Sequence, residues 1–334
     1  MKKVRVGING FGRIGRLLFR AGFENVEFVG INNLGDARSA AHLLKYDSTH
    51  GRFAKSVDHD EKSLIVDGKK IPLSASKDPA QIPWKDWGCD VVLECTGAFK
   101  GKEDFVKHIH AGAKRVLVSA PADGADLTVV YGINHTSYDP AKHQVLSNAS
   151  CTTNCLAPIA KVMNETFGIE TGMVTTIHSY TNDQQVLDAV HKDLRRARAA
   201  GLSMIPTSTG AAKAVGLVMP ELKGKIDGVA VRVPTPNVSL VDLVFRSNKA
   251  VSVDAINEAL TKAAQTTLKG VLAVENEPLV SVDFNGSTYS SVADLTNTMV
   301  MGPNMAKVFS WYDNEMGFSH RMIDVVRYMA EKGL

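Results

Sequence analysis

Short apolar runs alternate with longer amphipathic stretches in the first half of the chain. The runs rich in β-branched residues predict strands at residues 4–8, 26–31, 90–94, 115–119 and 128–132. Several of them are apolar on both faces, as expected of parallel strands covered by helices. Between the first two runs, Ile14, Leu17, Leu18 and Ala21 recur at helical spacing. A strand, a helix and a strand within about thirty residues form a βαβ unit, whose repetition predicts a doubly wound parallel sheet.

The pattern changes after residue 150. Alternation of apolar and polar positions predicts long strands at 172–180, 228–233, 239–246 and 306–313, typical of a mostly antiparallel sheet with helices on one face. In the run 228–233 the three valines share one face, so we expect them to be buried and Arg232 to lie on the opposite face. Helical spacing recurs after residue 155, at 253–265 and at 319–333. Because Pro158 is not at a helix start, we expect it to kink the first of these helices or to delay its beginning.

The fold class is therefore α/β in two parts. With 334 residues the chain exceeds one typical core. We expect a Rossmann-type dinucleotide-binding domain over 1–150, a catalytic α+β domain over 151–317, and a C-terminal helix, about 318–334, that packs back on the first domain.

Composition excludes several classes of protein. Hydrophobic residues make up 44% and charged residues 22%, with a net charge of +3, so neither a nucleic-acid nor a membrane partner is indicated. No apolar run approaches the roughly 20 residues of a membrane helix, and no signal segment precedes the first strand pattern. We expect a cytoplasmic protein. Four cysteines form neither a disulfide framework nor the paired ligand pattern of a structural zinc site, so no metal is expected.

The segment Gly10-Phe-Gly12-Arg-Ile-Gly15 fills the G-x-G-x-x-G pattern between a predicted strand and helix. The first glycine allows the tight turn, the second admits a pyrophosphate and the third allows close packing of helix and strand. The positive end of the helix, with Arg13, then faces the phosphates. This context predicts dinucleotide binding.

The acidic residue expected at the end of the second strand is missing. Its position falls on Asn33, a neutral amide that would not repel the 2′-phosphate of NADP. No arginine follows to bind that phosphate, and Lys77 is the basic residue that we nominate. The motif alone leaves the choice between NAD and NADP open.

The segment SNASCTTNCLAP raises a separate question about its two cysteines. Cys151 lies at a predicted helix start, where the helix N-terminus stabilises a thiolate. His178, at a strand end among hydroxyls and an acid, is the candidate base. Cys155 lies one helical turn further on, as a small core residue or as a resolving thiol after oxidation, and we favour the former.

Seven motifs then give a resemblance that covers essentially the whole chain. INGFGRIGR, SNASCTTNCLAP, HSYTNDQ, DLRRARAA, TSTGAAKAV, RVPTPNVS and SWYDNEMGFSH occur in order, and together they closely resemble the phosphorylating glyceraldehyde-3-phosphate dehydrogenases (type I). The resemblance implies oxidation of D-glyceraldehyde 3-phosphate with NAD(P) and inorganic phosphate to 1,3-bisphosphoglycerate, in glycolysis or gluconeogenesis. Cys151 would form the hemithioacetal and thioester, with His178 as its base and as a donor to the oxyanion.

The resemblance also implies a set of binding residues. For the substrate phosphate these are Thr181 and Arg232, and for inorganic phosphate Ser150, Thr152, Arg196, Thr209 and Gly210. Beside the glycine loop, the cofactor residues are Arg13, Ile14, Asn33, Lys77, Thr96, Gly97, Ser119 and, for the nicotinamide, Asn314. Arginine forks, hydroxyls and glycine N–H groups suit phosphate.

The chain departs from the family pattern at the cofactor-specificity positions. Strict NAD users usually carry Asp at position 33 and Leu-Pro where this chain has Ala189-Val190, and NADP users tend to have Ala-Ser there. We therefore predict NAD as the working cofactor with appreciable use of NADP.

Two rival functions and one partner remain to be weighed. Erythrose-4-phosphate dehydrogenase shares the cysteine and histidine but uses water on the thioester, and a non-catalytic Rossmann-type binding protein would turn nothing over. The intact TSTGAAKAV and HSYTNDQ segments favour phosphate as acceptor. Arg195, Arg196 and Arg198 resemble a nucleic-acid patch, but in the family this loop lies between subunits, which implies a homotetramer.

Overall fold

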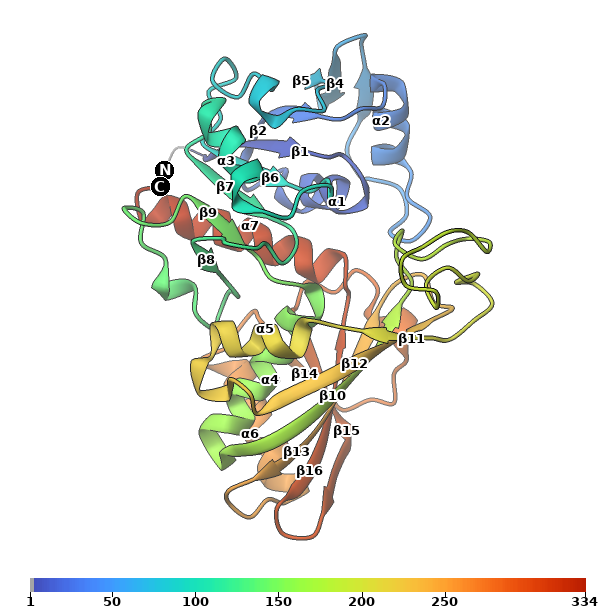
Figure 1. Ribbon diagram of the computed structural model, residues 1–334, viewed down its shortest axis with the longest axis vertical. Coiled ribbons are helices and arrows are strands. Elements are labelled where there is room, and N and C mark those ends of the chain that lie inside the picture. The colour runs from blue at the N-terminus through green and yellow to red at the C-terminus, as the bar shows by residue number, and fades with distance from the viewer. Residues whose placement is uncertain (1–2) are drawn as a thin grey trace. The chain divides into compact units, whose positions relative to one another are not determined.

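The computed structural model describes residues 3–334, which form two compact units (Figure 1). The first unit comprises the chain up to Val129, His135–Ala149 and Ser319–Leu334. The second comprises Val130–Asn134 and Ser150–Phe318. The end of the chain thus returns to the unit in which the chain begins.

The first unit is built on a nine-stranded sheet in the order β3-β4-β5-β2-β1-β6-β7-β9-β8. Its strands are β1 (Arg5–Asn9), β2 (Glu27–Asn32), β3 (Val57–His59), β4 (Ser63–Val66), β5 (Lys69–Ser74), β6 (Val91–Glu94), β7 (Arg115–Val118), β8 (Leu127–Thr128) and β9 (Val145–Ser147). Neighbours from β5 to β8 pair in parallel, whereas β3, β4 and β5 form an antiparallel meander. The predicted doubly wound parallel sheet is confirmed.

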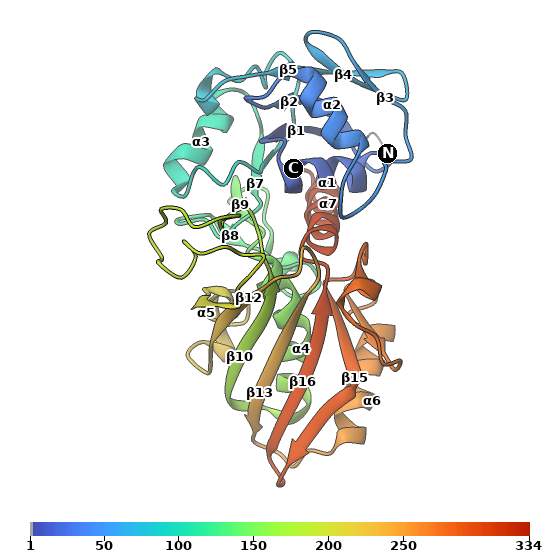
Figure 2. The ribbon, with the colours of Figure 1, turned by 90° about the vertical axis from the view of Figure 1, so that its right-hand side faces the viewer.

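Helices cover both faces of this sheet. They are α1 (Arg13–Gly22), α2 (Ala37–Lys45), α3 (Lys102–His110) and α7 (Met316–Glu331). In Figure 2, α1, α2 and α7 lie on one side of the sheet and α3 on the other. A Cβ atom at Gly22 of α1 would lie 2.7 Å from Cδ1 of Ile323 in α7, so this small residue lets the two helices pack closely.

The second unit is built on a seven-stranded sheet in the order β11-β12-β10-β13-β16-β15-β14. Its strands are β10 (Ile169–Ser179), β11 (Ile205–Ser208), β12 (Ile226–Val233), β13 (Ser239–Ser247), β14 (Leu272–Glu275), β15 (Ser291–Met301) and β16 (Met305–Tyr312). Only β10–β12 and β14–β15 pair in parallel within this described sheet. Helices α4 (Cys151–Phe167), α5 (Ala211–Val218) and α6 (Val253–Gln265) cover one face (Figure 2). The predicted mostly antiparallel sheet is confirmed.

One sequence-based expectation about local structure is wrong, and of the two alternatives given for Pro158 the delayed helix start is excluded. The strand expected at 128–132 is only the two-residue β8, because the chain turns at Val130, whose N–H donates to Oδ1 of Asn134 at 2.8 Å. The helix after residue 150 begins at Cys151 and not later, with Pro158 inside it. Ser150 caps this helix, because its side chain accepts a hydrogen bond from the N–H of Thr153.

Arg232 does lie opposite the valines of β12, as expected, but the expectation that those valines are buried is wrong. Val229 is 51% exposed, whereas Ile226 and Ala230 are buried, so the valine face of β12 is the outer one. Arg232 therefore shares the inner face with Ala230, on the side that the helices cover. Burial against α5, and not the size of the valines, decides which face is inner.

Candidate active site

The candidate nucleophile, Cys151, stands at the N-terminus of α4. Cys151 is the first residue of that helix and is partly buried, and Cys155, one turn further on, is fully buried. The capping Ser150 leaves the first backbone N–H groups of the helix turned toward the sulfur, so the positive end of the helix dipole lies beside it. Cys155 is a core residue in contact with Ser291 and Ser310, as the favoured interpretation held.

His178 and Arg232 occupy the same register position on neighbouring parallel strands, β10 and β12. Because side chains alternate along a strand, both project from the helix-covered face toward the start of α4. Nε2 of His178 lies 3.5 Å from Sγ of Cys151, and a guanidinium nitrogen of Arg232 lies 3.0 Å from Nδ1 of His178. The sheet thus brings the three predicted residues together.

The shorter of the two contacts at Nδ1 of His178 indicates the tautomer of the imidazole. Nδ1 of His178 lies 2.6 Å from the carbonyl oxygen of Ser179. A carbonyl oxygen only accepts, so Nδ1 carries the ring proton and Nε2 keeps its lone pair. The guanidinium of Arg232 donates to the same carbonyl at 3.2 Å. The nitrogen that faces the thiol is therefore free to accept its proton.

Burial, and not the helix dipole, dominates the acid–base state of the pair. Burial raises the pKa of the Cys151 thiol, and Arg232 and backbone N–H groups at the start of α4 only partly oppose it. Burial and then the charge of Arg232 lower the pKa of His178 to about 3. Near neutral pH the site therefore holds a thiol and a neutral imidazole. The helix N-terminus and Arg232 favour a thiolate, as expected from the sequence, but burial opposes it.

A buried tyrosine that the sequence analysis did not single out supports this pair. The hydroxyl of Tyr312 lies 2.9 Å from Oγ1 of Thr152 and 2.8 Å from Oγ1 of Thr176, and its ring meets His178 edge-on. Tyr312 stands in the SWYDNE run, two residues before Asn314, and that run is the signal that could have identified it. The side chain of Thr152 is thus engaged with Tyr312, and its backbone N–H faces the sulfur of Cys151.

The N-termini of α4 and α5 meet beside Ser150. Oγ of Ser150 lies 2.8 Å from Oγ1 of Thr153, whose hydroxyl contacts the carbonyl of Ala211 at the start of α5. Thr209 and Gly210 precede Ala211, and a Cβ atom at Gly210 would find open space. Two helix N-termini side by side favour an anion.

Arg196 reaches this region from the loop that follows β10. Its guanidinium donates to Oγ1 of Thr207 at 2.9 Å and to the carbonyl of Ser208 at 3.3 Å, next to Thr209, and it pairs with Asp183. Asp183 and Thr207 were not singled out from the sequence, although Asp183 lies in the HSYTNDQ segment. Thr181 is exposed just beyond β10, with its N–H donating to the side chain of Gln184.

The glycine loop of the first unit has the geometry of a dinucleotide site. Gly10 adopts a φ of +92°, and a Cβ atom there would meet the backbone N of Thr96 at 2.7 Å. A Cβ atom at Gly15 would lie 2.1 Å from the carbonyl oxygen of Gly10. At Gly12, which caps α1, it would meet nothing within 4 Å. The loop is therefore closed on its inner side and open above the helix N-terminus, as a pyrophosphate requires.

The remaining cofactor residues of the first unit differ in how they are held. Ile14 lies in the first turn of α1, and Arg13 there pairs with Asp47 at 3.3 Å. Asn33 follows β2, where its side-chain oxygen accepts from the N–H of Phe11 at 3.4 Å, and Lys77 is exposed beyond β5. Thr96 and Gly97 follow β6, and Ser119 follows β7. These positions lie at the carboxyl ends of the parallel strands, where such folds bind ligands. The positive charge of Arg13 is balanced by Asp47.

Asn314, in the second unit, has an orientation set by two serines. Its Oδ1 accepts hydrogen bonds from the hydroxyls of Ser179 and Ser239, each at 2.8 Å. The amide nitrogen is thus left as a donor. Neither serine was singled out from the sequence.

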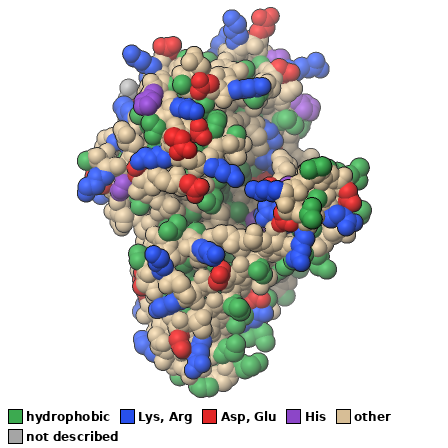
Figure 3. All heavy atoms as spheres, in the orientation of Figure 1, with side chains coloured by type: hydrophobic (Ala, Val, Ile, Leu, Met, Phe, Trp, Pro, Cys, Tyr) green, Lys and Arg blue, Asp and Glu red, His purple; other side chains and the backbone are tan. Residues whose placement is uncertain are grey.

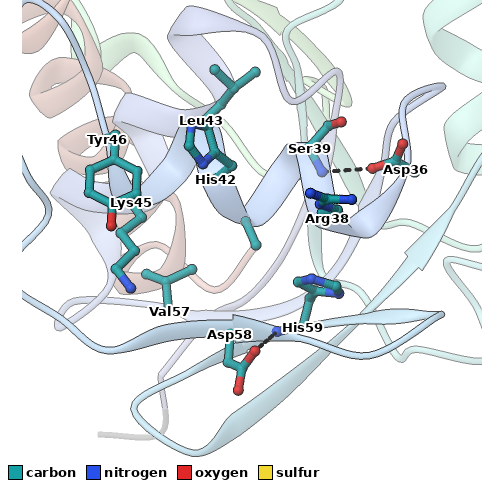
Figure 4. A pocket seen from close by; sticks show the side chains of 11 residues that line it. Asp36, Arg38, Ser39, His42, Leu43, Lys45, Tyr46, Val57, Asp58 and His59 are labelled. Atoms are coloured by element: carbon teal, nitrogen blue, oxygen red, sulfur yellow. Dashed lines mark hydrogen bonds between the residues drawn. The ribbon is translucent and has the colours of Figure 1, made fainter.

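An open pocket in the first unit lies apart from all these residues. It has a volume of about 690 Å³ between α2 and β3 and carries charges of both signs, including Arg38, Lys45, Asp36 and Asp58 (Figure 4). The carboxylates of Asp36 and Asp58 are already occupied by the N–H groups of Ser39 and His59. Among residues 3–334 no group of three or more His, Cys, Asp or Glu side chains is placed to hold a metal ion. Every described helix is also too short or too polar to cross a bilayer.

The electrostatics of Cys151 lead to a prediction about its reactivity. We expect iodoacetamide to modify Cys151 faster than Cys89, Cys95 or Cys155, because burial raises the pKa of those three thiols much further, and a cation opposes it only weakly at Cys89, through Arg5. Arg232→Gln should slow modification of Cys151 at pH 7 by about tenfold, since one pKa unit corresponds to a factor of ten in thiolate. Rates from mass spectrometry across pH 6–10 test this, with Arg246→Gln, an exposed arginine of the same sheet, as the matched control. Equal rates in the two variants would contradict it.

Comparison with known proteins places the chain in a family. Residues 4–102 match the model of the glyceraldehyde 3-phosphate dehydrogenase NAD binding domain, and residues 150–314 match that of the C-terminal domain. The chain is 60% identical over 332 residues to glyceraldehyde-3-phosphate dehydrogenase 1 of Bacillus cereus, with 99% of each chain covered. It is 59% identical over 333 residues to the glyceraldehyde-3-phosphate dehydrogenase of Geobacillus stearothermophilus, again covering 99% of each. The chain belongs to the glyceraldehyde-3-phosphate dehydrogenase family.

Proposed function

We propose that this protein is a phosphorylating glyceraldehyde-3-phosphate dehydrogenase of glycolysis or gluconeogenesis. It would oxidise D-glyceraldehyde 3-phosphate with NAD and inorganic phosphate to 1,3-bisphosphoglycerate. The observation that carries the proposal is the contact of 3.5 Å between Sγ of Cys151 and the unprotonated Nε2 of His178, with Arg232 beside them. The domain division 1–150 and 151–317 follows the same logic: one part binds the dinucleotide and the other carries the chemistry.

The first step is addition of the thiol to the aldehyde. Sγ of Cys151 forms a bond to the aldehyde carbon while Nε2 of His178 takes the thiol proton. The aldehyde oxygen becomes an oxyanion, which the protonated His178 and the backbone N–H of Cys151 stabilise. Because the resting pair is neutral, proton transfer accompanies the attack instead of preceding it.

Substrate binding strengthens this base. Arg232 lowers the pKa of His178, and its buried Nε has no hydrogen-bond partner among the described residues. A substrate phosphate bound by Arg232 and Thr181 would neutralise the guanidinium and remove that effect. The pKa of His178 then rises, so the imidazole becomes a competent proton acceptor only when the phosphorylated aldehyde is present.

Oxidation and acyl transfer complete the cycle. NAD, when bound, supplies the hydride acceptor, so collapse of the hemithioacetal leaves a thioester on Cys151. The amide nitrogen of Asn314 is a donor suited to the nicotinamide carboxamide. Inorganic phosphate, held by Ser150, Thr152, Arg196, Thr209 and Gly210, attacks the thioester carbon. The sulfur leaves and regains its proton from His178, and the acyl phosphate departs.

The fit of NAD rests on the open space above Gly12 and on the tight turn at Gly10. Asn33 offers no negative charge against a 2′-phosphate, and the exposed Lys77 offers no fixed partner to it. We therefore propose NAD as the working cofactor with appreciable use of NADP.

A homotetramer is supported by exposed apolar side chains on two surfaces of the second unit. One is the loop 183–204 between β10 and β11, where hydrophobic side chains gather on the right of Figure 3: Val186, Leu187, Val190, Leu194, Leu202 and Met204 are 73–99% exposed. The other is the outer face of the sheet, with Met173, Val229, Met299, Met301 and Met305. Two separate apolar surfaces allow two kinds of two-fold contact, which a tetramer needs and a dimer does not.

A cytoplasmic setting is part of the same proposal. All four cysteines are free thiols, and the chemistry requires Cys151 to stay reduced. A reducing compartment maintains that state.

A spectrophotometric assay at 340 nm tests the function. Wild type should reduce NAD with glyceraldehyde 3-phosphate and nearly stop when phosphate is omitted, whereas a dehydrogenase that uses water on erythrose 4-phosphate would continue. His178→Asn should lower the acylation rate by about 10²–10⁴-fold. Its NAD affinity, measured by calorimetry, serves as the control and should be nearly unchanged. Activity within about threefold of wild type in that variant would rule out the assigned base.

Cofactor discrimination is the second measurable property. We expect wild type to prefer NAD over NADP in kcat/KM by less than about a thousandfold, or about 4 kcal/mol. Asn33→Asp should widen that preference by at least about tenfold, because a carboxylate repels the 2′-phosphate. Asn33→Ser, neutral like the native residue, is the control. A wild-type ratio above a thousandfold would refute the relaxed discrimination.

The assembly can be measured by sedimentation. The wild-type mass should be four times the 36.0 kDa of one chain. Val190 is 99% exposed within one chain, so Val190→Asp should leave the fold intact and shift the protein toward smaller species. Val253→Asp, at the start of α6, is the matched control, because a carboxylate suits a helix N-terminus. A wild-type protein that sediments as a monomer at micromolar concentration would overturn the tetramer.

A further inference from the structure

A row of buried polar side chains crosses the first sheet at the carboxyl ends of its central strands. Asn32 of β2, Asn9 of β1 and Glu94 of β6 are in register with one another. They are 2–3% exposed. Burial of an amide or a carboxylate is costly unless its hydrogen bonds are satisfied, so the row calls for a physical reason.

The row is continuously hydrogen-bonded. Nδ2 of Asn9 donates to Oε2 of Glu94 at 2.6 Å, and Nδ2 of Asn32 donates to Oδ1 of Asn9 at 2.8 Å. Oδ1 of Asn32 accepts from the hydroxyl of Ser74 and from the N–H of Ser76, both at 2.8 Å. The row therefore links β5, β2, β1 and β6, and each amide can take only one orientation.

Glu94 stands at the end of the row, and its carboxylate accepts every one of its hydrogen bonds. Oε1 accepts from the N–H and the hydroxyl of Thr96, and Oε2 accepts from Asn9 and from Nε2 of His108 at 3.0 Å. His108 is fully buried, and its Nδ1 accepts from the indole N–H of Trp84 at 2.9 Å. Trp84 thus fixes the Nε2–H tautomer, and that N–H points at Glu94.

Each member of the row stands directly before a segment of the dinucleotide site. Asn9 precedes Gly10, Asn32 precedes Asn33, and Glu94 binds Thr96 two residues on. Gly10 packs against the backbone of Thr96. The Glu94 carboxylate therefore holds the backbone of Thr96, in the loop after β6, close against Gly10.

We propose that Glu94 and His108 are positioning residues for the dinucleotide, acting through Asn9, Asn32 and Thr96 without touching it; this rests on the proposed function. Their role is to fix the spacing of three cofactor loops. Glutamine cannot replace Glu94 here. Its NH₂ group would face the N–H of Thr96 in one orientation, or the N–H of His108 and the amide of Asn9 in the other. Either orientation sets donor against donor.

Calorimetric titration of NAD into the intact protein, with no substrate, tests the proposal. Glu94→Gln should raise the Kd for NAD by at least about tenfold, equivalent to about 1.4 kcal/mol, with kcat at saturating NAD within about threefold of wild type. Val116→Ala, fully buried in the neighbouring strand of the same sheet, is the control for loss of stability. The proposal fails if Val116→Ala lowers Tm as much as Glu94→Gln and raises the Kd for NAD by the same factor. It also fails if Glu94→Gln binds NAD with the wild-type Kd.

A second pair of variants keeps the test decisive should Glu94→Gln not fold. Trp84→Phe removes the indole donor to His108, and Trp87→Phe alters the neighbouring indole, which meets the Trp84 ring edge-on. Only Trp84→Phe should change the ¹⁵N shifts of the His108 ring and raise the Kd for NAD, by about threefold. Identical behaviour of the two variants would overturn the proposal. Absence of NAD binding to wild type would instead refute the proposed function.

Discussion

The hydrogen bond from Nδ1 of His178 to the carbonyl of Ser179 is the constraint on which the chemistry depends. It places the proton of the neutral ring on Nδ1, the nitrogen away from the sulfur, so Nε2 can act only as an acceptor toward Cys151. The parallel pairing of β10 with β12 then places the guanidinium of Arg232 on the same side. Backbone pairing therefore decides which groups surround the sulfur before any ligand enters, and burial keeps the pair neutral.

The two units use buried charge in opposite ways. The carboxylate of Glu94 has every acceptor position filled by donors from its own chain, which makes the cofactor loops rigid. Arg232 keeps an unpartnered nitrogen in the second unit, at a cost in desolvation. A charged side chain whose hydrogen bonds are all made within the protein supports the structure. A charged side chain with an unused hydrogen-bond donor, such as Arg232, is available to a ligand.

The sequence alone predicted both sheets and most of the chemistry, because strand periodicity and the motifs are local signals. It missed the meander β3–β5, whose short strands carry little periodicity. It also took the valine face of β12 to be the buried one, since valine size does not reveal which side α5 covers. The supporting residues Tyr312, Ser239 and His108 were missed as well. Their partners lie 14 to 160 positions away in the chain, and such contacts leave no mark on a single sequence.

The long connection between β10 and β12 follows from their parallel pairing, since parallel neighbours cannot be joined by a tight turn. That connection carries Arg196 and the N-terminus of α5, and it also carries the apolar loop 183–204. Asp183 and Asp193 of the loop form ion pairs with Arg196. The proposed subunit contacts and the proposed inorganic-phosphate site therefore lie on one crossover, and separation of subunits would act on Arg196 through these two carboxylates.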